Sequence, residues 1–114
     1  MLSEADVVRH RQMLDATQEA IAFASNRSRQ DLDEDRMLSF ALVRAIEIIG
    51  EAANKVSPEG RALCPNLPWP SLIGMRNRIV HAYFDIDLNR VWDTVTEDLP
   101  PLMSELRAVL AGQT

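Results

Sequence analysis

A regular apolar stripe over residues 38–56 constrains the fold of this chain more than any other feature. The apolar residues recur every three or four positions, as on one face of an α-helix, and they are Leu38, Leu42, Ala45, Ile46, Ile49, Ala53 and Val56. No stretch of the 114 residues alternates apolar and polar side chains as a half-buried strand would. We therefore expect an all-α protein with this helix at the centre of its core.

Capping residues and helix breakers set the limits of the first two helices. Ser3 can cap a helix over about residues 4–25, whose apolar face carries Val7, Leu14 and Ile21. The central helix follows a cap at Asp31 or Asp33 and ends at the proline- and glycine-containing segment 57–60.

Proline also shapes the second half of the chain. Segment 64–70 holds three prolines, so the next helix is expected to begin at a Ser71 cap. A fourth helix starts near Asp87 or Leu88 and must kink or split at Pro100-Pro101, after which a last helix runs to about Leu110. Its inward residues are Leu88, Val91, Trp92, Val95 and Leu99. The expected fold is an antiparallel bundle of four to five helices with a kinked or split C-terminal helix, in one domain over residues 1–114.

Composition and charge exclude several classes of protein. No apolar run is long enough to cross a bilayer and the first residues are acidic, so a cytoplasmic protein without a membrane partner is expected. A net charge of −5 argues against a protein that coats nucleic acid, so RNA would have to meet a local basic patch. Cys64 is the only cysteine and is interpreted as a packed small side chain. No cofactor or metal site is expected.

The segment Arg76-Asn77-Arg78-Ile79-Val80-His81-Ala82-Tyr83 is the best candidate for a chemical site. A histidine can transfer a proton near neutral pH, and an arginine can hold a phosphate through two parallel hydrogen bonds. This combination suits metal-free chemistry on a phosphodiester. The alternative is a polar helix face whose residues only cap their neighbours.

This segment resembles the R-x4-H-x-Y signature of the HepT-like toxins, which belong to the HEPN superfamily of small α-helical ribonucleases. Further similar stretches are 44–55, Pro68-Trp69, 73–77 and 87–102, so the resemblance covers about residues 36–110. It implies a HEPN-like bundle that forms a homodimer, with the signature of each protomer in the cleft between them. It also implies that a cognate minimal nucleotidyltransferase antitoxin adds AMP to Tyr83 and so silences the toxin.

The spacing of the signature bears on how such a site assembles. At 100° per residue, Arg76 and His81 are about 140° apart around a regular helix and cannot converge on one phosphate. Either the helix loosens near His81, or a second copy supplies the missing group across a two-fold axis.

The predicted function is a metal-independent endoribonuclease toxin of a type VII-like toxin–antitoxin system. In this hypothesis His81 and Arg76 are catalytic, while Asn77 and Arg78 orient or bind the RNA substrate. The alternative is a non-catalytic helical binding module, or a substrate-presenting subunit that partners a minimal nucleotidyltransferase.

Other conspicuous residues receive structural interpretations. Glu47 and Glu51 have the spacing of a carboxylate pair for acid–base or metal chemistry, but pairing of Glu51 with Lys55 and a solvated or groove-lining Glu47 are favoured. Gly50 inside a helix indicates a close helix approach. His10, between two arginines, is expected at the surface, and Trp69 and Trp92 are expected in the core or at an interface.

Overall fold

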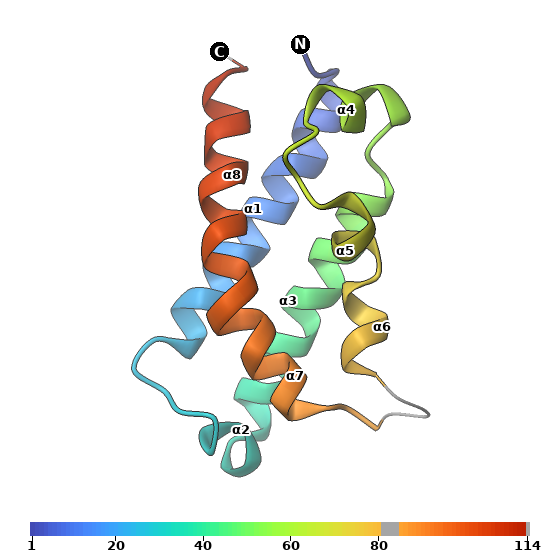
Figure 1. The fold of residues 1–114 in the computed structure, drawn as a ribbon. Helices are drawn as coiled ribbons and strands as arrows, with labels where there is room; N and C mark the ends of the chain where they lie inside the picture. Colours follow the sequence, from blue (N-terminus) through green and yellow to red (C-terminus); the bar gives the residue numbers. More distant parts are fainter. Residues whose placement is uncertain (81–84, 114) are drawn as a thin grey trace.

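The computed structural model describes residues 1–80 and 85–113, and its regular elements are helices (Figure 1). Three long helices run along the molecule, which measures 44 × 30 × 19 Å: α1 (Glu4–Ala24), α3 (Arg36–Asn54) and α8 (Leu99–Ala111). The short elements are α2 (Asp31–Glu34), α4 (Pro58–Leu63), α5 (Trp69–Ile73), α6 (Met75–Ile79), α7 (Leu88–Asp93) and the π-helix η1 (Thr94–Asp98). The all-α prediction is confirmed.

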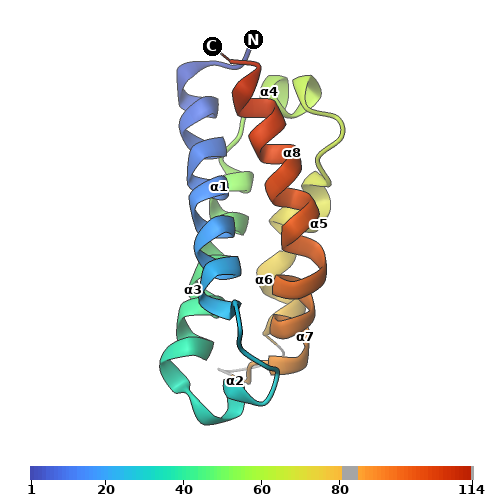
Figure 2. The ribbon, with the colours of Figure 1, turned by 90° about the vertical axis from the view of Figure 1, so that its left-hand side faces the viewer.

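Helix α3 lies at the centre of the bundle. It packs against α1 on one side and against α5 and α6 on another, while α8 packs along α1 (Figures 1 and 2). All seven residues of the predicted stripe are buried. Trp69 joins this core and donates a hydrogen bond from Nε1 to the Cys64 carbonyl at 3.0 Å, and the Cys64 side chain is buried as expected.

The buried face of α1 differs from the prediction. Ser3 does cap the helix, accepting a hydrogen bond from the Asp6 N–H at 3.1 Å. The buried residues of α1, however, are Asp6, His10, Met13, Ala16, Thr17 and Ala20, whereas the predicted Val7, Leu14 and Ile21 are only half-buried. This face contains three polar side chains, so apolar periodicity could not identify it.

The prediction that His10 lies at the surface is wrong, because its side chain is fully buried. Its Nδ1 lies 2.7 Å from the Asp6 carbonyl one turn earlier, and its ring meets the Trp69 ring edge-on with centroids 5.6 Å apart. Thr17 similarly donates to the Met13 carbonyl at 2.7 Å. Bonds to the helix's own backbone let these polar side chains enter the core.

Asp6 connects α1 to the start of α4. Its carboxylate accepts hydrogen bonds from the backbone and the hydroxyl of Ser57, which is also the N-cap of α4. Burial would raise the pKa of Asp6, but these bonds, a bond from Ser3 and the charge of His10 hold it below its usual value. Burial raises the pKa of the Cys64 thiol, and the negative charge of the Asp6 carboxylate raises it further.

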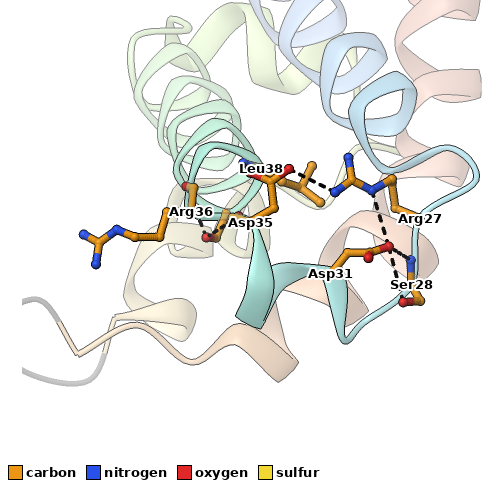
Figure 3. Close-up of polar contacts among 7 residues, drawn as sticks. Arg27, Ser28, Asp31, Asp35, Arg36 and Leu38 are labelled. Atoms are coloured by element: carbon orange, nitrogen blue, oxygen red, sulfur yellow. Dashed lines mark hydrogen bonds and ion pairs between the residues drawn. The ribbon is translucent and has the colours of Figure 1, made fainter.

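Helix α3 begins later than predicted, after Asp35 and not after Asp31 or Asp33. The cap of α3 is Asp35, whose extended backbone ends α2 and whose carboxylate accepts from the Leu38 N–H at 3.1 Å. Asp31 instead accepts from the Ser28 N–H at 2.7 Å, the main cause of its lowered pKa. Arg27 bridges Asp31 and Asp35 across this turn (Figure 3).

Two further boundaries differ from expectation. Helix α3 ends at Asn54, before segment 57–60, and that segment begins the short helix α4. Pro58 occupies the first turn of α4, where its missing N–H costs little. At the other end of the chain, α7, η1 and α8 follow one another without a break, after an Asp87 cap. The predicted disturbance is the π-helical turn that ends just before Pro100 and Pro101, where the Leu99 N–H bonds to the Thr94 carbonyl.

Candidate functional site

The signature segment begins on α6, which a close helix contact positions. At Gly50 of α3 an added Cβ would lie 3.2 Å from the Leu72 carbonyl oxygen of α5. Glycine therefore permits the close approach of α5 to α3, as the glycine inside the predicted helix indicated. Ser71 lies inside α5 and does not cap it, since the helix begins at Trp69. Gly74 separates α5 from α6.

Helix α6 ends at Ile79, within the signature. Val80 is extended, with φ −109° and ψ 116°, and forms an antiparallel bridge with Ile86. The Asp87 N–H donates to the Ile79 carbonyl at 2.7 Å. A regular helix therefore does not continue from Arg76 to residue 81. His81 and Tyr83 themselves lie outside the described residues.

Arg76 projects into a cleft between α3 and α6. The cleft has a volume of about 690 Å³ and is lined by Arg36, Phe40, Val43, Glu47, Arg76, Val80 and Ile86. The Arg76 side chain is 54% exposed, and its Nε donates to Glu47 Oε2 at 3.3 Å. An ion pair this exposed is weak, so an incoming phosphate can compete with Glu47 for the guanidinium.

The other polar signature residues that the structure describes, Asn77 and Arg78, do not line this cleft. Arg78 donates from Nη2 to the Ser71 carbonyl at 2.8 Å and lines a separate hollow that also contains Glu97 and Asp98. Asn77 is exposed on α6. Of the sequence-predicted site residues in the described part of the chain, the structure places Arg76 alone in the cleft.

Helix α3 contributes cleft residues that sequence reasoning missed. The Arg36 guanidinium lies over the Phe40 ring, 5.0 Å from its centroid, and Phe40 is 62% exposed. Four-residue spacing of an arginine and a phenylalanine was the available signal. Glu47 belongs to the groove-lining network, while Glu51 pairs with Arg44 at 3.3 Å instead of with Lys55.

Neither a metal-ligand cluster nor a membrane-spanning helix occurs within residues 1–80 and 85–113. There, His, Cys, Asp and Glu side chains do not gather in groups of three or more as a metal site requires. Within the same ranges, each helix is too short or too polar to traverse a bilayer.

Comparison with known proteins identifies the family. Residues 13–109 match the family model described as ribonuclease HepT-like. The chain belongs to this family. It is 37% identical to a probable ribonuclease HepT of Thermococcus cleftensis, over 82% of this chain and 88% of the relative. The chain is also 34% identical to a Methanocaldococcus jannaschii protein named as an RNase, over 85% of this chain and 89% of the relative.

A third relative, from Caldanaerobacter subterraneus, also carries an RNase name and is 34% identical over 71% of this chain and 72% of its own. No solved structure shows a significant match to the chain. The part of the chain that matches the HepT-like ribonuclease family includes α6, where the Arg76 cleft opens.

Proposed function

We propose that this HepT-like protein is the endoribonuclease toxin of a toxin–antitoxin pair and cleaves RNA without a metal ion. The observation that carries the proposal is Arg76, an exposed guanidinium in a cleft of about 690 Å³, with the signature histidine following in the sequence directly after cleft residue Val80. The family match supports ribonuclease chemistry in general.

The proposed reaction uses the ribose 2′-hydroxyl as nucleophile. His81 takes its proton, the 2′-oxygen bonds to phosphorus, and the bond from phosphorus to the 5′-oxygen breaks. A second histidine protonates the leaving 5′-oxygen, so the products are a 2′,3′-cyclic phosphate and a 5′-hydroxyl. Arg76 stabilises the added negative charge on the phosphoryl oxygens.

A second histidine requires a second protomer, because His10 is buried in the core and is the only other histidine of the chain. We therefore propose a homodimer in which the two clefts face each other across the two-fold axis. The end of α6 at Ile79 also supports the alternative in which one chain supplies both Arg76 and His81, because the helix that carries Arg76 ends before position 81. Asn77, exposed beside Arg76, is proposed to orient substrate.

Arg78 receives a smaller role in this proposal. Its bond to the Ser71 carbonyl and its position away from the cleft favour a structural contribution or guidance of RNA from outside. Glu47 is proposed to hold Arg76 extended in the cleft until a phosphate replaces it.

Silencing is proposed to occur through AMP transfer to Tyr83 by a cognate minimal nucleotidyltransferase. Tyr83 stands three residues before Ile86, which lines the Arg76 cleft. An attached nucleotide would bring negative phosphate and bulk to the residue that RNA phosphate must reach.

One experiment tests cleavage and silencing together. The chain is expressed alone and with the cognate transferase, and labelled RNA is incubated with purified protein in excess EDTA. Wild type and Tyr83→Phe should cleave, with cyclic phosphate ends, while Arg76→Ala and His81→Ala should lose at least about 100-fold in rate. Co-expression with the transferase should silence the wild type but leave Tyr83→Phe active. Mass spectrometry of the silenced wild type should show AMP attached to Tyr83.

The controls separate the parts of the proposal. Activity that requires a divalent ion would overturn the metal-independent mechanism. A transferase that neutralises Tyr83→Phe without an adduct would replace covalent silencing by complex formation. An inactive chain that still accepts AMP would favour the substrate-presenting subunit.

A further inference from the structure

The cleft contains an exposed aromatic ring that the proposed chemistry does not use. Phe40 lies in the second turn of α3 and exposes 62% of its surface. Arg36, one turn earlier, is placed over the ring, and in the described part of the chain this guanidinium forms no ion pair with a carboxylate. Figure 3 shows its side chain pointing away from the Arg27, Asp31 and Asp35 cluster.

The surroundings of Phe40 are apolar on one side and charged on another. Val43, Val80 and Ile86 line the cleft beside the ring, and Arg76 lies in the same cleft. An adjoining hollow shares Arg36, Phe40, Val43 and Ile86 with the cleft, but it also contains the carboxylates of Asp33 and Asp85. Phosphate is therefore attracted toward Arg76 and repelled from the Asp33 side, whereas an uncharged planar group can occupy the apolar part between them.

We propose that Phe40 and Arg36 form a stacking site for one unpaired nucleobase of single-stranded RNA, next to the phosphate position at Arg76. The inference rests on the proposed function and adds the substrate class: RNA whose bases are unstacked and accessible. Proteins bind such bases on phenylalanine rings and arginine planes, and Arg36 supplies a cation that strengthens the aromatic platform. Double-stranded RNA would not place a base in the cleft, because its bases remain stacked.

The direct test measures binding without cleavage. The probe is a short single-stranded oligoribonucleotide with every 2′-hydroxyl methylated. The comparison probe is an abasic strand, which has the same backbone but no bases. Because stacking contributes about 1–3 kcal/mol per base, Phe40→Leu should weaken binding of the base-bearing strand by roughly 5- to 150-fold and leave binding of the abasic strand within about twofold. Phe40→Trp should retain the preference for bases.

Phe23 offers a matched control. It is also an exposed phenylalanine, at 43%, but lies on α1 and lines a different hollow with Arg44. Phe23→Leu should bind both strands as the wild type does. Circular dichroism and sedimentation of each variant show whether fold and oligomeric state are retained.

Several outcomes would overturn the stacking site. Equal affinity of Phe40→Leu and wild type for the base-bearing strand is one. Equal loss for the base-bearing and abasic strands is another, since phosphate contacts alone would then be affected. A third is dissociation of an oligomer specifically in Phe40→Leu, which would show that a second copy covers the ring. Base-dependent binding by a protein that fails to cut unmethylated RNA would count against the proposed cleavage alone.

Discussion

Asp6, Ser57 and Gly60 show how single residues connect distant segments in this protein. The Asp6 carboxylate receives two hydrogen bonds from Ser57, and Gly60 packs directly against it. An added Cβ at Gly60 would lie 2.3 Å from Asp6 Oδ2, too close for the carboxylate to remain in place. This buried charge therefore depends on a glycine as well as on its donors.

Gly60→Ala should consequently destabilise the protein, although alanine favours helices by about 1 kcal/mol. Displacing a hydrogen-bonded carboxylate costs about 2–3 kcal/mol, so the free energy of unfolding should fall by about 1–2 kcal/mol in urea titrations. Gly112→Ala is the control, because its nearest contact is the Val109 carbonyl at 3.5 Å. A Gly60→Ala protein as stable as Gly112→Ala would contradict this account.

Individual residues also mark the limit of prediction from sequence. The helix start near Asp87 or Leu88 and the burial of Val91, Val95 and Leu99 follow from local pattern and are confirmed. The burial of His10 depends on Trp69, which is far away in the sequence, while its neighbours Arg9 and Arg11 suggest a surface position. Local pattern carries no information on such a partner.

At the scale of elements, the contact between α3 and α5 positions the signature arginine. Gly50 allows the Leu72 carbonyl of α5 to approach α3, and α6 with Arg76 follows after Gly74. Glu47, one turn before Gly50 on α3, then reaches Arg76 across the cleft. The spacing of α3 and α5 thus bears on the geometry of the candidate site.

Gly50→Val should disturb this spacing. Its extra methyl groups must push α5 away, and overpacking of this kind costs about 1–3 kcal/mol of unfolding free energy. Arg44→Val places the same side chain on the exposed face of α3 and removes an exposed ion pair with Glu51, worth at most about 1 kcal/mol. We expect urea unfolding to rank Gly50→Val clearly below Arg44→Val in stability, and the reverse ranking would exclude tight packing at Gly50.

The elements themselves were predictable to different degrees. The stripe of α3 follows from helical period, and the two prolines indicate a disturbance of the last helix. The break at Asp35 was not predictable, because three aspartates compete as caps. Asp31 accepts from the Ser28 N–H and Asp33 pairs with Arg29, while Asp35 accepts from the Leu38 N–H and caps α3. The cleft was not predictable either, since it joins Arg36 and Phe40 to Arg76 across the fold.

At the scale of the whole molecule, the proposed dimer would build each active site from residues of both chains. If one groove uses Arg76 and His81 from two chains, then inactive Arg76→Ala and His81→Ala proteins should regain partial cleavage when mixed and allowed to exchange subunits. The rate of RNA cleavage before and after mixing is the measurement. A monomeric variant that cleaves as well as the wild type would show that one chain suffices.

The two ends of the described chain lie together at one end of the bundle, away from α2 and α7 (Figure 1). The Leu2 N–H donates to the Gln113 side chain at 2.9 Å, so a short peptide linker would span the distance between them. The exposed loop between α1 and α2, where Asn26 has a φ of 62°, could then be opened to give new termini. Such a circular permutant would keep the contacts of α1 with α3 and α8, because they depend on packing and not on chain order.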